Sequence, residues 1–243
     1  MTSVADLGAR RLSAVADQAS SLVNRAADAA TQAAARPASK ALEVARSYAP
    51  VQPPQIPAEG VSAANKLLRQ LGINAFTPTL GFSTDLTLPI GVGGAVAGPY
   101  TPGVGNLSVA GFSLNAVRRG EILCGFVPVG GIFADFGDKS GIHVAWLNLN
   151  TLRGGFDTPL GGLIDTVLDA VVSHAKAAPI PATAYSTPVS ALKRALAVIP
   201  SNGVRGGVVE TGPGLVLCAI YGTVKRGGTT YVFFPSFGLT EAH

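Results

Sequence analysis

The chain of 243 residues has few charged and few aromatic side chains. Charged residues make up 13% of it and aromatic residues 7%, with a single tryptophan, whereas about a quarter of an ordinary soluble domain is charged. Mean hydropathy is positive, at +0.37. Because a soluble monomer has difficulty hiding so much apolar surface, the composition favours a large self-interface or a contact with lipid.

No stretch has the form of a transmembrane helix or of a secretory signal peptide. The longest uncharged stretch runs from Leu86 to Val117, but Pro89, Pro99 and Pro102 interrupt it together with many glycines. The N-terminal segment carries charged residues and lacks a continuous apolar run. We therefore expect no membrane-spanning helix and no export by the general route, whereas other routes stay open.

The residues from which catalytic and metal sites are built are scarce. The chain has two cysteines and three histidines, and no histidine has a Cys, Asp or Glu at metal-ligand spacing. A GxSxG motif is absent, and the glycine-rich stretch 89–99 lacks both GxGxxG spacing and a following lysine. That stretch is better interpreted as a small-residue strand pair or a mobile loop. We expect no catalytic residue, no metal and no cofactor.

A small enzyme or ligand carrier built on the C-terminal part is an alternative, and it would need a pocket near Cys124, His143 or Asp135. Cys124 and His143 could form a nucleophile pair, because such pairs are adjacent in space rather than in sequence. Asp135 and Asp138 could share a cation, although two carboxylates alone argue weakly for one.

The two cysteines lie in strand-like apolar runs, Cys124 in ILCGF and Cys218 in LVLCAI. Buried free thiols are the expected state of cysteines in such runs. The alternative is a disulfide between Cys124 and Cys218, which would imply an oxidising compartment.

The net charge is +4, which suits weak attraction to an anionic surface. The positive residues are too dispersed for a nucleic-acid interface, so we expect no nucleic-acid partner. The triplet Arg-Gly-Gly occurs at 153–155, 205–207 and 226–228, and each copy lies between apolar runs. These three triplets are predicted to be turns.

Residues 4–36 repeat every eleven positions, as VADLGARRLSA, VADQASSLVNR and AADAATQAAAR. Eleven residues complete three helical turns, so one face stays almost straight along a helix. Such a helix can lie on lipid or pack against copies of itself. Small residues along one seam favour self-packing, and this predicted oligomerisation seam comprises Gly8, Leu12, Val15, Ala19, Leu22, Ala26, Ala29 and Ala33.

Two other interpretations of the repeat stay open. The helix could coat a lipid droplet or storage granule, which is the first functional alternative. The repeat could also reflect chance or recent duplication in an alanine-rich chain.

The chain is predicted to be α+β, with a long Ala-rich helical arm before a β-rich domain that is sandwich- or barrel-like. Residues 1–49 form the oligomerisation arm, 50–72 a Pro-rich linker and short helix, and 73–243 the β-rich domain with a helical insertion at about 160–198. Strands are predicted at 74–89, 106–117, 121–134, 142–150, 204–210, 214–225 and 229–235. The run LVLCAIY is apolar on both faces, so we expect protein or lipid to cover each of the two faces.

The Ala- and Gly-rich, aromatic-poor texture, as in GVGGAVAGPYTPGVGNLSVAGFSLNAV, resembles that of tube- and pore-forming cell-envelope proteins of mycolic-acid bacteria. The resemblance implies self-assembly in or on an outer lipid layer, and it carries over no functional positions. Together with the repeat, it leads us to expect a non-enzymatic, envelope-associated homo-oligomer. Its partners would be further copies of itself and a lipid or membrane surface.

Overall fold

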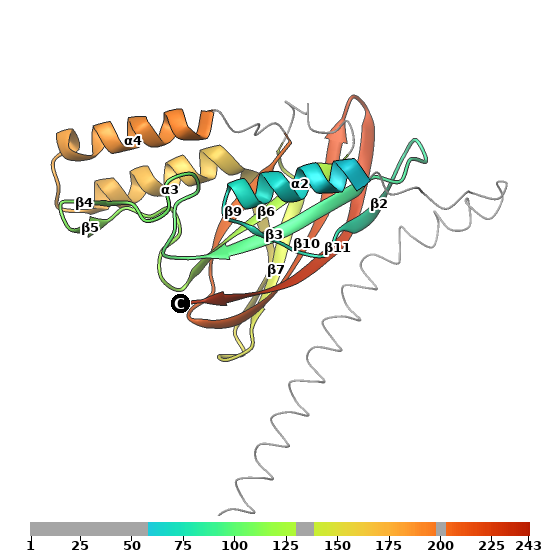
Figure 1. Ribbon diagram of the computed structural model, residues 1–243. Helices are drawn as coiled ribbons and strands as arrows, with labels where there is room; N and C mark the ends of the chain where they lie inside the picture. The colour runs from blue at the N-terminus through green and yellow to red at the C-terminus, as the bar shows by residue number, and fades with distance from the viewer. Residues whose placement is uncertain (1–57, 130–138, 198–202) are drawn as a thin grey trace, which may run out of the picture. The chain divides into compact units, whose positions relative to one another are not determined.

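A computed structural model describes residues 58–129, 139–197 and 203–243 of the chain (Figure 1). All of them belong to one compact unit, Gln55–His243. The predicted arm over 1–49, with its seam from Gly8 to Ala33, lies outside the described residues. So do most of the Pro-rich linker and the loop that contains Asp135 and Asp138.

Eight of the described strands close into one antiparallel ring. Its order is β3-β2-β11-β10-β7-β8-β9-β6, and β6 pairs back onto β3. A ninth strand, β1 (Asn74–Ala75), extends the pairing of β3. The ring strands are β2 (Thr79–Ser83), β3 (Ile90–Ala97), β6 (Glu121–Val129), β7 (Ile142–Asn148), β8 (Gly154–Gly162), β9 (Arg205–Glu210), β10 (Gly214–Arg226) and β11 (Thr229–Ala242).

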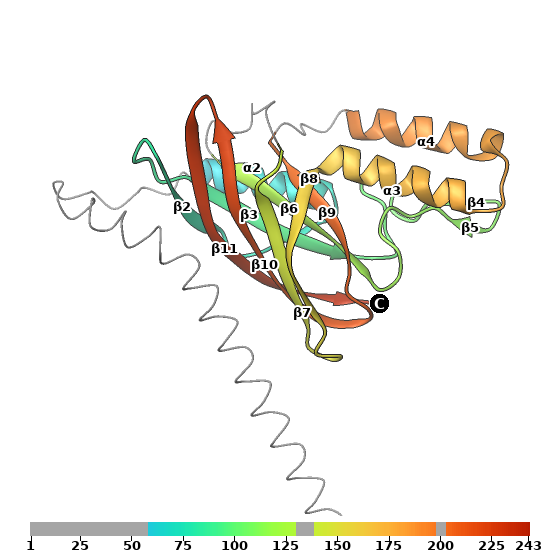
Figure 2. The ribbon, with the colours of Figure 1, turned by 180° about the vertical axis from the view of Figure 1, so that it is seen from behind.

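The described helices cover only one side of this ring. They are α2 (Ala58–Gln70), α3 (Leu163–Ala177) and α4 (Ala182–Ala197). On α3, buried residues recur every four positions, from Leu163 through Val167 and Val171 to Ala175, so one stripe faces the protein. This stripe, α4 and α2 share a hydrophobic core with the outer sides of β3 and β6. In Figure 2, which shows the molecule from behind, β7, β10 and β11 have no described helix in front of them.

A second hydrophobic core fills the inside of the ring. The rings of Phe126 and Phe233 meet there edge to face, with their centroids 5.1 Å apart. Gly91 of β3 makes room for them, because a Cβ built on it would lie 2.2 Å from the Phe126 ring and 3.1 Å from that of Phe233. The described residues are therefore α+β, as predicted, with a barrel-like closed sheet that has one core inside and another beneath the helices.

Several predicted elements differ from those observed. The segment 106–117 contains only a small hairpin, β4 (Ser108–Val109) with β5 (Phe112–Ser113), instead of one long strand. The triplet 205–207 was predicted to be a turn but lies in β9, and 153–155 leads into β8. The glycines of β9 are needed because Leu160 and Leu163 pack closely over them. The turn at 226–228 is confirmed as the connection between β10 and β11.

Two further predictions need correction. The stretch 89–99, predicted to be a small-residue strand pair or a mobile loop, contains the single well-paired strand β3. The helical insertion begins later than 160, because β8 continues to Gly162 and α3 begins at Leu163. The second helix begins at Ala182 and accommodates Pro188 within it.

Candidate assembly surface

From Leu215 to Ile220, the strand β10 alternates between a buried and an accessible face. Its even-numbered residues Val216, Cys218 and Ile220 are fully buried inside the ring. Its odd-numbered residues point outward, and Leu215 is 39% exposed. The sequence predicted that both faces would be covered. Among the described residues, only the inner face of β10 is.

The neighbouring strands continue this outward apolar surface in register. Leu217 of β10 lies opposite Leu147 of β7 on one side and Leu239 of β11 on the other. The next row places Ala219 between Ala145 and Phe237. We call this surface the outer apolar face, and it consists of Ala145, Leu147, Leu215, Leu217, Ala219, Phe237 and Leu239.

The most exposed members of the outer apolar face are large. Phe237 is 53% exposed and Leu239 is 55% exposed. Single exposed apolar residues are common on proteins, but a continuous apolar patch of several hundred Å² marks an interaction site. The cross-strand rows make these residues one patch rather than scattered exceptions.

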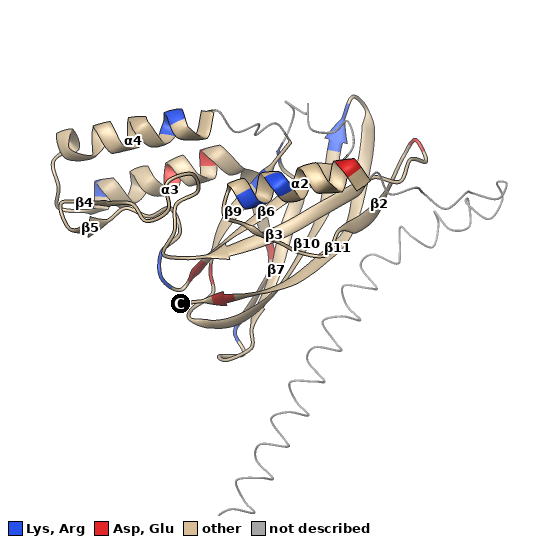
Figure 3. Cartoon of the chain, viewed as in Figure 1, with Lys and Arg blue, Asp and Glu red and all other residues tan. Residues whose placement is uncertain are grey.

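Opposite charges lie near the two ends of the β10–β11 pair, on its outward side. Glu241 is exposed and pairs across the strands with the outward residue Leu215. Lys225 is exposed and has the same outward parity at the other end of β10, opposite Thr230. Figure 3 shows the basic tip of the β10–β11 hairpin and an acidic position on β11 near the C-terminus. The apolar rows therefore lie next to Glu241, and Tyr221 and Thr223 separate them from Lys225.

A polar cluster of Tyr221, Asp157 and His143 borders the outer apolar face. The Tyr221 hydroxyl donates to Asp157 Oδ1 at 2.8 Å, and His143 Nδ1 lies 3.8 Å from the same oxygen. The rings of His143 and Tyr221 stack with centroids 6.3 Å apart. Burial, reinforced by the hydrogen bond to Asp157, raises the pKa of Tyr221 to about 12. The hydroxyl therefore stays protonated and keeps this donor at neutral pH.

The structure does not bring Cys124 and His143 together as a nucleophile pair. Cys124 is completely buried inside the ring, whereas His143 lies on the outer side of β7, with its Nδ1 3.3 Å from the main-chain oxygen of Asp157. An activated cysteine needs an electropositive, partly exposed environment. The interior instead raises the pKa of the Cys124 thiol well above its usual range, through a hydrogen bond with Cys218 and through burial.

The two cysteines do come together, from opposite walls of the ring. Cys124 belongs to β6 and Cys218 to β10, and both are fully buried. Both are free thiols in the structure. Since their side chains are neighbours, the predicted alternative of a Cys124–Cys218 disulfide stays a prediction.

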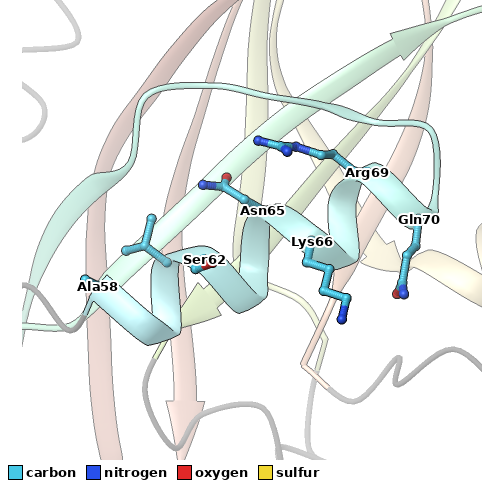
Figure 4. A pocket seen from close by; sticks show the side chains of 7 residues that line it. Ala58, Ser62, Asn65, Lys66, Arg69 and Gln70 are labelled. Carbon is cyan, nitrogen blue, oxygen red and sulfur yellow. The ribbon is translucent and has the colours of Figure 1, made fainter.

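A hollow of about 810 Å³ lies along α2 (Figure 4). Figure 4 shows Asn65 and Arg69 on one side of the helix and Lys66 with Gln70 on another. The described lining comes from this single helix: Ala58, Val61, Ser62, Asn65, Lys66, Arg69 and Gln70. One helix wall cannot orient a substrate or ligand from several directions, so the hollow is not assigned a chemistry.

His174 has a structural role that the sequence did not indicate. Its Nδ1 lies 2.7 Å from the main-chain oxygen of Asn115. The buried Asn115 side chain in turn accepts from Leu107 N at 2.7 Å and donates to Asn106 Oδ1 at 2.7 Å. The loop between β3 and β6 is thereby fixed to α3, and no sequence motif marks Asn115 as the centre of this network.

Neither a metal centre nor a membrane-crossing helix is found in the ranges that the structure describes. No three His, Cys, Asp or Glu side chains gather there in a way that could hold a metal ion. None of the helices in those ranges combines the length and the apolar character needed to cross a bilayer. Comparison of the chain with family models, curated proteins and solved structures gave no match.

Proposed function

We propose that this chain is a non-enzymatic structural protein that works as a homo-oligomer associated with the cell envelope, and that its copies build a larger particle such as a tube or a pore. The observation that carries this proposal is the outer apolar face. It is continuous over three strands, and no described residue covers it. Burial of apolar surface drives association at about 25 cal/mol per Å².

The predicted arm would supply a second contact. Five of the eight residues in its seam from Gly8 to Ala33 are glycine or alanine, and such small residues let helix backbones approach closely. After Val23, alanine is almost the only apolar residue in the repeat. We therefore assign the arm to helix–helix contacts and the outer apolar face to sheet contacts.

The enzyme or ligand-carrier alternative fits the described residues less well. The inside of the ring is filled with large side chains such as Phe126 and Ile220, both fully buried. Cys124 lies within this packing, and His143 lies outside it. A ligand inside the ring would have to displace core side chains.

The lipid-coat alternative differs from self-assembly in one observable property. A coat helix would gain helical structure on liposomes, whereas a bundled arm would already be helical in water. Circular dichroism of the full chain with and without liposomes separates the two.

Mass measurement of the full chain, in detergent and without it, tests the proposal. We expect a defined multiple of the 24.5 kDa chain mass, and light scattering coupled to gel filtration measures it. The triple change Leu12→Asp, Val15→Asp and Leu22→Asp should reduce this multiple if the arm contributes.

A second variant tests the sheet contact. Phe237→Ser with Leu239→Ser removes the two most exposed side chains of the outer apolar face and should also reduce the mass. The matched control is Phe112→Ser, since Phe112 is 40% exposed on β5, away from the face. A wild-type chain that stays at single-chain mass at tens of micromolar would refute the proposed function.

A further inference from the structure

We propose that Cys124 and Cys218 form a disulfide across the inside of the ring when the chain folds in the presence of a disulfide oxidant, and that the closed ring then preserves whichever redox state the pair had at closure. The inference gives the disulfide that the sequence allows a position in the fold and a time of formation. It does not depend on the proposed self-association.

The two cysteines belong to separate parts of the ring. Cys124 lies on β6, which pairs with β3 and β9, and Cys218 lies on β10, which pairs with β11 and β7. They are 94 positions apart in the chain. Among the described strands, β6 and β10 are not hydrogen-bonded neighbours. A bond between the two cysteines would therefore cross the interior instead of joining adjacent strands.

Contacts of the β3 glycines show which parts of β10 and β11 lie across the interior from them. A Cβ on Gly91 would lie 3.1 Å from Cδ1 of Phe233. A Cβ on Gly93 would lie 2.9 Å from Oγ of Ser236 and 3.2 Å from Cδ1 of Ile220, which are register partners. A step of two residues forward along β3 thus leads forward along β11. Because β10 is antiparallel to β11, the same step leads backward along β10.

The next step along β3 reaches the level of both cysteines. Ala95 follows Gly93 on the same face of β3 and pairs with Cys124 of β6. The corresponding step backward from Ile220 along β10 reaches Cys218. Both thiols are fully buried, and a hydrogen bond joins them. The register and the hydrogen bond therefore agree that the two side chains are neighbours, as a disulfide requires.

The bond forms in two thiol–disulfide exchanges. The thiolate of one cysteine attacks a sulfur of the oxidant, which is a low-molecular-weight or protein disulfide, and one thiol of the oxidant leaves. The other cysteine attacks the mixed disulfide, the S–S bond between Cys124 and Cys218 forms, and the second thiol of the oxidant leaves. The two cysteines lose two protons and two electrons, and the oxidant gains them.

The closed ring prevents both exchanges. A mixed disulfide needs space for the oxidant beside the cysteine, but both thiols are fully buried in a core that also holds Phe126 and Ile220. The hydrogen bond with Cys218 and burial also hold the pKa of Cys124 well above its usual range, whereas the thiolate is the reactive form. Oxidation therefore has to precede closure of the ring, and the same shielding protects the bond from reductants afterwards.

The bond would constrain a long part of the chain. The segment between the two cysteines contains β7, β8, α3, α4 and β9, and the stabilisation by a disulfide grows with the length of the loop that it closes. Disulfides form and persist in oxidising compartments. The redox state of the pair therefore depends on the compartment in which the chain folds, and it affects the stability of the ring.

Refolding of the full chain tests the proposal. Reduced chain in urea is diluted into a buffer of reduced and oxidised glutathione. It should regain the native emission of Trp146, become lighter by two hydrogen atoms, and yield a tryptic product in which residues 120–139 are joined to residues 206–225. Its urea midpoint should lie about 1 M above that of chain refolded with reduced glutathione alone.

The time of formation is tested on the folded protein. Chain that has folded with both thiols reduced should be oxidised by the same glutathione buffer about a hundredfold more slowly than chain that is refolding in it, because the ring has to open first. Oxidised, folded chain should likewise keep its bond in dithiothreitol until urea is added.

Two variants serve as controls. Cys218→Ala removes one partner, so no internal link should form. Cys124→Ala with Ile122→Cys moves the thiol two residues along the inward side of β6, where Ile122 is also fully buried. Because this thiol is no longer at the level of Cys218, the linked fraction at equilibrium in the glutathione buffer should fall about tenfold.

Several results would overturn the inference. They are two free thiols, a glutathione adduct or an intermolecular bond in the refolded wild type, an oxidised chain without native emission, and equal linkage from position 122. Oxidation of the folded reduced chain as fast as that of the refolding chain would refute the protection by the closed ring. None of these results concerns the mass of the particle, so the proposed self-association is tested separately.

Discussion

A substitution at Gly91 tests whether the ring is closed around a packed interior. A Cβ at this position would lie 2.2 Å from Cζ and 2.7 Å from Cε2 of Phe126, whereas carbon atoms in good contact are about 3.5–4.0 Å apart. The Phe126 ring would have to move by more than 1 Å. Phe233, which packs edge to face against the Phe126 ring, also lies 3.1 Å from the added Cβ.

The expected cost follows from this lack of room. Overpacking a filled core lowers the free energy of unfolding by about 1–3 kcal/mol. We expect the loss for Gly91→Ala to lie near the upper end of this range, because the backbone at 91 and the Phe126 ring are both constrained. Phe126→Leu removes Cζ and leaves a smaller side chain, at about 1–2 kcal/mol. In the double variant the added methyl group occupies part of the space of the lost ring. The free energy of unfolding of the double variant should then be about 1–2 kcal/mol higher than the sum of the two single effects predicts.

Urea unfolding measures the four free energies, and Trp146 supplies the signal. It is the single tryptophan of the chain and packs against the inner core. Gly105→Ala is a control for the intrinsic effect of replacing glycine, since no atom lies within 4 Å of the added Cβ, although its φ of +76° adds strain. The interior is not packed as described if the effects of the two substitutions on the free energy of unfolding are strictly additive, or if Gly91→Ala leaves that free energy unchanged.

The remaining predictions concern the border cluster, the thiols and the loop network. Tyr221 should ionise with a midpoint near pH 12. Because this raised pKa keeps the folded state protonated, its stabilisation is complete below pH 10 and is lost as the pH rises from 10 to 12; Asp157→Asn should lower the midpoint in an ultraviolet titration. Cys124 and Cys218 should react with a thiol reagent only after unfolding, as two thiols per chain, and a count of zero would identify a disulfide instead. Asn115→Ala should lower the free energy of unfolding by about 2–3 kcal/mol in urea, since several buried groups lose their hydrogen-bond partner; a loss below 0.5 kcal/mol would contradict the network.

Local signals in the sequence were sufficient for the elements that need no distant partner. The run TVKRGGTTYVF predicted the β10–β11 hairpin, because glycines at 227 and 228 adopt the positive φ that the turn requires. The apolar period of α3 predicted its buried stripe. In each case the residues that form the element also carry the pattern.

Strands that depend on distant partners were missed for a physical reason. The segment 154–162 contains four glycines, a proline and an aspartate, which argue against a strand. The segment nevertheless forms the strand β8, because β7 and β9 provide hydrogen-bond partners on its two sides. Gly91 of β3 likewise favours a loop from the sequence alone, whereas it makes room for the ring of Phe126, a residue of the neighbouring strand β6.

The candidate site was predictable in part. The pattern of LVLCAIY showed that β10 would have two apolar faces. It could not show which face would remain uncovered, because that depends on where the helices pack. Nor could it show that Leu147 and Leu239 would extend the face sideways, since strand neighbours follow from the order of the ring.

The location of the helices determines which of the apolar strands keeps an accessible apolar face. The strand β6 is also apolar on both faces, and both are buried within one copy, Cys124 and Phe126 inside the ring and Leu123 and Val127 towards the helices. The apolar excess of β6 is thus accounted for without a partner. On β10 the same pattern leaves Leu215 and its outward neighbours accessible. Since both strands follow one pattern and only one lacks a cover among the described residues, the apolar surface that β10 leaves accessible lies on the side opposite the helices, where a second copy can bury it.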